Sequence, residues 1–152
     1  MFEFLSTIPQ DLHPMIVHFP IVLFMLSFIF ALASRFLPKL QDSEWLLLVL
    51  GAITAPLAVI TGLGAHLPYE ETALAAVIEP HQFSAILGTL VMVGVTIWRY
   101  TSRRKGKDIG RSPAYLVFAV LGILWIVIVG GTGGQLVYTH AINVRGVNPL
   151  LP

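Results

Sequence analysis

The stretch LHPMIVHFPIVLFMLSFIFALASRFL, residues 12–37, decides the class of fold. From Pro14 onward it is almost entirely apolar, and a helix of about 20 such residues crosses a hydrocarbon core about 30 Å thick. We therefore predict a transmembrane helix over residues 14–37. Pro20 lies inside this helix and removes one amide donor, so we expect a kink in its first turns.

The rest of the chain has the same character. Of its 152 residues, 56% are hydrophobic and 11% are charged, whereas soluble domains carry about 25% charged residues. Three more apolar stretches predict membrane spans at residues 44–65, 80–100 and 113–140, and Pro80 and Pro113 suit first helical turns. The segment HLPYEETALAAVIE is expected to lie along the membrane surface. The prediction is one all-α domain over residues 1–152, an integral membrane four-helix bundle.

Lysine and arginine predict the orientation of the bundle. Eight of the nine lysine and arginine residues lie at two connections, one between spans one and two and the other between spans three and four. The ninth is Arg145. By the positive-inside rule these loops are cytoplasmic, so both termini are expected outside, on the periplasmic side of a bacterial inner membrane. The N-terminus lacks the basic segment of a cleavable signal peptide, so the first span is expected to be retained. The predicted outer end is acidic, with Glu3, Asp11, Glu70, Glu71 and Glu79.

Composition also excludes several kinds of site. The chain has no cysteine, which rules out disulfides, thiolate metal sites and cysteine-anchored haem. The net charge of +1 predicts no affinity for nucleic acid. No pairing of a nucleophile with a base is apparent, so an electron-transfer role fits better than an enzyme with its own substrate.

All histidines map to the predicted outer end, and every predicted span contributes at least one. Counting about 1.5 Å per residue from the inner ends places His18 and His81 in a deeper layer. The same count places His13, His66 and His140 in a shallower layer. Imidazole is the commonest nitrogen ligand of metals, and two histidines on facing helices can hold a b-type haem.

Glycines lie near several of these histidines. Gly88 follows His81, Gly62 precedes His66, and three more precede His140, namely Gly130, Gly133 and Gly134. Small residues can open a slot for a macrocycle, but they also allow close helix packing in membranes. Both interpretations stay open at this point.

Three motifs resemble the DUF2231 family of small bacterial membrane proteins: LHPMIVHFPIVL, EPHQFSAILG and GGQLVYTHAINV. The resemblance covers essentially the whole chain. By position it assigns the family's histidines to His13, His18, His81 and His140, and it leaves out His66. Ala141 stands where the family usually has glycine. In some longer proteins the family sits beside cytochrome-type modules, and the resemblance therefore implies redox proteins as its company.

Together these observations predict a membrane-bound cytochrome with two b haems that transfers electrons near the outer face. The expected axial pairs are His18 with His81 and His13 with His140, and His66 is a further candidate ligand. The glycines expected at the haems are Gly88, Gly133 and Gly134.

Several partners are compatible with this role. They are membrane lipids, a basic periplasmic redox protein or a quinone, and further copies or subunits of a larger redox complex.

Two other functions are considered. The histidines could bind or transport copper or zinc, although the inner halves of the predicted spans lack the His, Asp and Glu that a transport path needs. The chain could also be a scaffold subunit whose histidines are incidental.

Overall fold

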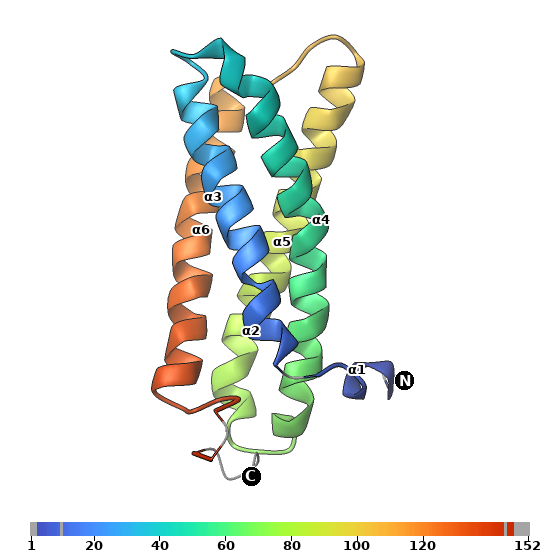
Figure 1. Cartoon of the computed structure of the whole chain (residues 1–152), viewed down its shortest axis with the longest axis vertical. Coiled ribbons are helices and arrows are strands. Elements are labelled where there is room, and N and C mark those ends of the chain that lie inside the picture. The colour runs from blue at the N-terminus through green and yellow to red at the C-terminus, as the bar shows by residue number, and fades with distance from the viewer. Residues whose placement is uncertain (1–2, 10, 145, 148–152) are drawn as a thin grey trace.

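Four long helices run side by side in a computed structural model that describes residues 3–9, 11–144 and 146–147 (Figure 1). The described residues form helices, turns and loops without strands, which confirms the predicted all-α membrane bundle. The first and last described residues lie at the same end of the bundle. The elements are α1 (Glu3–Ser6), α2 (Leu12–Ile16), α3 (His18–Ala33), η1 (Pro38–Leu40), α4 (Gln41–His66), η2 (Leu67–Tyr69), α5 (Ala75–Arg104) and α6 (Pro113–Tyr138).

The first span is broken at Val17, between α2 and α3. Proline has no N–H, so Pro20 cannot donate to the carbonyl of Ile16, the last residue of α2. The helix is therefore interrupted in the turns where the sequence predicts a kink, and the position of the break follows from the proline. The helix begins at Leu12, two residues before Pro14, so His13 lies within the first turn.

The other boundaries differ by a few residues from those predicted. α4 begins at Gln41, three residues before the predicted start of the span. α5 begins at Ala75, so Pro80 lies inside the helix, and the last five of the 14 residues expected along the membrane surface belong to α5. The start of α6 is as predicted, because Pro113 occupies its first turn and the Ser112 hydroxyl accepts from the amide of Tyr115 at 3.2 Å.

The core lies between the four long helices, and the most extensive contact is between α3 and α4. Phe24 and Phe28 are fully buried there. A Cβ on Gly51 would come within 2.7 Å of the Phe24 ring, and a Cβ on Gly122 within 2.5 Å of the Phe28 ring. These two glycines allow the close approach of helices that small residues provide in membranes.

The chain turns back after α6 at Ala141, whose φ is +52°. The amide of Ala141 donates to Val137 at 3.1 Å, and the amide of Ile142 donates to Leu136 at 3.0 Å. The Tyr69 hydroxyl then holds Asn143, accepting from its amide at 3.0 Å and donating to its Oδ1 at 3.1 Å. The left-handed conformation at Ala141 gives a physical reason for glycine at this position in the motif.

We predict that Ala141→Gly stabilises the protein by about 1 kcal/mol, because glycine adopts a positive φ without the steric cost that alanine bears. The free energy of unfolding in mixed detergent micelles measures the effect. Ala114→Gly, at an exposed helical position in α6, is the control and should lower stability by about 0.5–1 kcal/mol. Equal losses in both variants would contradict the prediction.

A buried charged cluster joins the helices at the end opposite the histidines, which we call the arginine end. Arg99 of α5 is 0% exposed and Glu44 of α4 is 1% exposed. Nη1 of Arg99 donates to Oε2 of Glu44 and, at 2.9 Å, to the hydroxyl of Tyr115 on α6. The Tyr115 hydroxyl donates to Oε1 of Glu44 at 2.5 Å, and Ser27 of α3 donates to the same oxygen at 3.1 Å. All four spans thus contribute to one cluster.

The α5–α6 loop completes this cluster with Asp108. Its carboxylate accepts from Nε of Arg99 at 3.0 Å, from Arg103 at 2.6 Å and from the amide of Gly110 at 2.8 Å. Burial opposes ionisation of Asp108, but the bonds from Arg99 and Gly110 and the charges of Arg99 and Arg103 outweigh it, so its pKa lies below its ordinary value. The loop is therefore held against the bundle by a charged carboxylate.

Glu44 and Arg99 correct one statement made from the sequence. The sequence predicts that the inner halves of the spans lack His, Asp and Glu. The structure instead places both side chains inside the bundle. Arg145, the one cation outside the two basic loops, lies outside the described residues.

Candidate functional site

A cavity of about 570 Å³ lies between the helices at the other end of the bundle, which we call the histidine end. Its volume falls in the range of ligand pockets, about 300–1,000 Å³. Its walls are mostly apolar and extend from Phe24 and Trp125 in the middle of the bundle to Asn143 beyond α6. Four of the five histidines line it: His13, His18, His66 and His81.

His13 reaches the cavity from α2 and is anchored to α4. Its Nδ1 lies 3.1 Å from the carbonyl oxygen of Ala58 and 3.3 Å from the hydroxyl of Thr61. A carbonyl only accepts, so Nδ1 carries the proton and donates. A Cβ on Gly62 would come within 2.9 Å of the ring, so Gly62 makes room for His13 and not for His66, which it precedes in sequence.

His81 reaches the cavity from α5 and is anchored to α6. Its Nδ1 lies 2.9 Å from the hydroxyl oxygen of Thr132. That hydroxyl donates its own proton to the carbonyl of Val129 at 3.1 Å, so the oxygen accepts from the ring. A Cβ on Gly133 would come within 3.1 Å of the ring, and this glycine therefore gives His81 its space.

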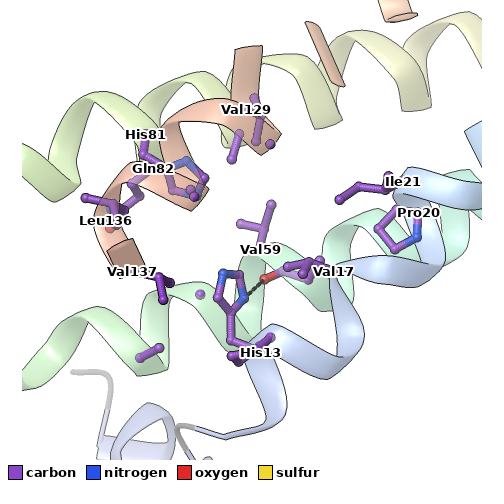
Figure 2. A pocket seen from close by; sticks show the side chains of 18 of the residues that line it. His13, Val17, Pro20, Ile21, Val59, His81, Gln82, Val129, Leu136 and Val137 are labelled. Atoms are coloured by element: carbon purple, nitrogen blue, oxygen red, sulfur yellow. Dashed lines mark hydrogen bonds between the residues drawn. The ribbon is translucent and has the colours of Figure 1, made fainter. Parts of the chain in front are cut away.

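The two rings lie on opposite walls of the cavity, as Figure 2 shows. Each is protonated at Nδ1, so each carries its lone pair at Nε2. Within the described parts of the chain, no hydrogen bond reaches either Nε2. Metal-binding histidines are typically oriented in this way, with one nitrogen donating to a carbonyl or hydroxyl and the other left for the metal.

His66 has a related but separate arrangement at the end of α4. Its side chain is 8% exposed, and its Nδ1 lies 2.5 Å from Oε1 of Gln82 on α5. Its Nε2 is buried and has no hydrogen-bond partner among the described residues. His66 is thus held by Gln82 with its Nε2 enclosed by the protein.

His18 and His140 are less enclosed. His18 is exposed at the rim of the cavity, just after the break at Val17. His140 is half-buried beyond the end of α6 and is not among the residues that line the cavity. The structure therefore brings His13 and His81 to one cavity, while it does not bring His140 to His13 as the predicted pairing requires.

The predicted glycines have three different surroundings. A Cβ on Gly88 would lie 1.9 Å from Trp125, so Gly88 packs against this ring and does not line the cavity. Gly133 contacts His81, as described above. Gly134 and Gly130 line the cavity one turn apart, and a Cβ on either would meet nothing within 4 Å. Of the three glycines predicted at a cofactor, Gly133 and Gly134 lie at the cavity and Gly88 serves helix packing.

Sequence analysis missed the partners that orient the rings, Thr132 for His81 and Gln82 for His66. Both are polar residues within apolar spans, which is the signal by which they could have been found. No three histidine, aspartate or glutamate side chains among the described residues lie close enough together to hold a bare metal ion. What the cavity offers is two imidazole rings, His13 and His81, each held through its Nδ1.

Comparison with known proteins places the whole bundle in one family. No curated protein and no solved structure matches the chain. The model of the family described as "Predicted membrane protein (DUF2231)" matches residues 9–146, which include all four spans and every histidine. The chain therefore belongs to the DUF2231 family of predicted membrane proteins.

Proposed function

We propose that this protein is a b-type haem protein of the membrane that transfers electrons, with His13 and His81 as the axial ligands of the haem iron. One observation carries the proposal. Two imidazoles on opposite walls of one cavity have their Nδ1 atoms held by the protein and their Nε2 lone pairs without a hydrogen-bond partner in the described structure. A haem iron takes two such nitrogens, and the group supplies one-electron chemistry.

The walls of the cavity support this assignment. They are mostly apolar, and Gly130 and Gly134 leave one side without side chains where a flat macrocycle needs room. The four lining histidines share one cavity, so the geometry favours one haem over the two expected from the sequence. In this proposal His18 lies at the rim and is not an axial ligand.

A bare copper or zinc ion is less well supported. Zinc sites in proteins use three or four side-chain ligands, and the described residues offer no group of three. Two opposed imidazoles suffice for haem because the porphyrin supplies the other four nitrogens.

The position of the cavity indicates where electrons would enter and leave. The arginine end carries the basic loops, so the positive-inside rule places it in the cytoplasm and the histidine end at the outer face. Asp11, Glu70, Glu71 and Glu79 are exposed near the histidine end. Their negative charge would attract a basic redox partner.

A visible absorption spectrum tests the proposal. The protein, expressed with ample haem and purified in detergent, should show sharp Soret and α bands on reduction with dithionite. The haem content should be near one per chain by the pyridine haemochrome assay. A folded protein without these bands would refute the proposal, and two haems per chain would restore the two-site prediction.

We predict that Gly134→Leu lowers haem affinity at least about tenfold. A leucine side chain would occupy the open wall, and overfilling a site costs about 1–3 kcal/mol. Gly131→Leu is the matched control, because Gly131 lies on the same helix in open space but does not line the cavity. Titration of the haem-free variants with haemin measures both affinities. Equal affinities would show that the Gly134 wall does not contact haem.

A further inference from the structure

A second pocket lies at the arginine end, between α4 and α5. Its volume is about 240 Å³, and it is lined by Trp45 of α4 and by Tyr100, Arg103 and Arg104 of α5. We call it the arginine pocket. Trp45 lies four residues from the start of α4, and Arg104 is the last residue of α5. The arginine pocket therefore lies where two spans leave the hydrocarbon core, at the depth of the lipid head groups.

Arg103 forms a fixed wall of the arginine pocket. Its Nη1 donates to Asp108 at 2.6 Å, and its Nη2 donates to Asp42 at 3.1 Å. Its guanidinium carbon also lies 5.2 Å from the centroid of the Trp45 ring, within the range of a cation–π contact. The charge of Arg103 is therefore balanced by two carboxylates, and three contacts set the orientation of its side chain.

Arg104 carries the unbalanced charge of the arginine pocket. Its side chain is exposed, and no ion pair or hydrogen bond holds its guanidinium in the described parts of the chain. The indole N–H of Trp45 and the hydroxyl of Tyr100 likewise have no hydrogen-bond partner there. A guanidinium donates and cannot accept, and the indole N–H only donates. This set of polar groups suits an anion.

The charge around the arginine pocket also favours an anion. Eight lysine and arginine residues lie at this end with three acidic residues, Asp42, Glu44 and Asp108, which leaves five positive charges in excess. The three carboxylates are already paired with Arg99 or Arg103. A guanidinium binds phosphate with two parallel hydrogen bonds, and basic pockets between membrane helices bind the head groups of anionic lipids.

One face of α5 has apolar and charged parts in the order in which a phospholipid has them. Leu90, Ile97 and Arg104 follow one another at intervals of seven residues, so they lie on the same face of the helix. Leu90 is 65% exposed and Ile97 is 56% exposed. Gly94 lies between them, and a Cβ there would meet nothing within 4 Å. An acyl chain can therefore lie along this face while its head group reaches Arg104.

We propose that the arginine pocket binds the phosphodiester head group of an anionic phospholipid. The Arg104 guanidinium donates to the phosphate oxygens, and an acyl chain contacts the face of Leu90 and Ile97. Inorganic phosphate carries the same anionic group but has no chain to contact this apolar face, so the lipid is the favoured source. The arginine pocket and the histidine cavity lie at opposite ends of the bundle, so this inference does not depend on haem.

Native mass spectrometry of the purified protein, released from a neutral detergent, tests the site by giving the Kd of the first bound lipid. The probes are phosphatidylglycerol and phosphatidylcholine with the same two oleoyl chains. Both contain the phosphodiester, but the choline cation cancels its charge. We expect phosphatidylglycerol to bind at least about tenfold more tightly, the effect of one hydrogen bond between charged groups. An excess of inorganic phosphate should not displace it.

Variants locate the bound lipid. Arg104→Gln should remove most of the preference for phosphatidylglycerol, and Arg104→Lys should retain part of it, because lysine keeps the charge but not the paired donors. Lys105→Gln is the matched control, because it removes the same charge one residue further along, outside the lining of the arginine pocket. It should keep the preference of the wild type. Circular dichroism checks that each variant folds, as expected for exposed side chains.

Three results would overturn the proposal. The first is equal binding of the two lipids to the wild type. The second is a preference that changes no more in Arg104→Gln than in Lys105→Gln, which would show only a diffuse attraction to the basic loop. The third is displacement of the lipid by inorganic phosphate, which would show a site for the free anion.

Discussion

In the proposed haem protein, replacement of His13 or His81 by alanine is expected to remove the haem absorption bands from the purified protein. In the proposal each ring supplies one nitrogen ligand to the iron through Nε2, and its Nδ1 bond to Ala58 or Thr132 fixes its orientation. Loss of an outer partner alone lowers metal affinity about 10–100-fold, so loss of the ligand itself should exceed about tenfold. Haem content per chain and haemin affinity of the haem-free protein measure the effect.

His18→Ala and His140→Ala are the controls for this experiment. His18 lies at the rim of the cavity and His140 outside its lining, so both variants should keep the reduced Soret and α bands. Retention of the bands in His81→Ala together with their loss in His140→Ala would contradict the assignment. It would favour the pairing of His13 with His140 that the sequence predicts.

Replacement of Glu44 by alanine will destabilise the bundle by about 3–5 kcal/mol, the usual cost of leaving a buried charge without its partner. Arg99 is fully buried and its Nη1 donates directly to Glu44. Ser27 and Tyr115 would lose the same carboxylate. Unfolding in mixed micelles of increasing sodium dodecyl sulfate, followed by circular dichroism, measures the free energy.

The double variant Glu44→Leu with Arg99→Leu distinguishes an unpaired charge from a simple loss of packing. Removal of both charges also removes the desolvation cost, so the double variant should be more stable than Glu44→Ala alone. Asp42→Ala is the surface control, because the Asp42 carboxylate pairs with Arg103 in an exposed position. This variant should change the free energy of unfolding by less than about 1 kcal/mol. Additive losses in the double variant would show that the pair has no coupling.

Much of the fold follows from the sequence, because a long apolar stretch in a membrane must satisfy its own backbone hydrogen bonds and therefore forms a helix. The four spans, the helix break near Pro20 and the start of α6 at Pro113 all depend on local rules of length and proline chemistry. The start of α5 was wrong by five residues, because proline at position 80 was assigned to a first turn. The segment before it is rich in helix-forming alanine, which extends the helix beyond the apolar stretch.

The site was predictable only in part. That the histidines gather at one end depends on their positions along the spans, which the sequence gives. Which ring faces which depends on the rotation of each helix and on the break at Val17, and counting residues determines neither. The same limit applies to glycine, since Gly62 lies under His13, 49 positions away, and Gly88 lies under Trp125.

The cluster around Arg99 and Glu44 was missed for a related reason. Both groups lie near the ends of the apolar stretches, where charges normally meet water or lipid head groups. Only their mutual geometry, together with Tyr115 and Asp108, allows them to be buried. A sequence shows the charges but not their partners.

The separation of the charged cluster from the cavity has a consequence for biogenesis. The cluster links all four spans at one end through protein side chains alone. The cavity lies at the other end, where the main contacts of α2 are with α3 and α4. If haem binds in the cavity as we propose, the arginine end could assemble before haem enters the histidine end from the bilayer. Maturation would then be a late step on a preassembled scaffold, and colourless protein would accumulate in the membrane when haem supply is limited.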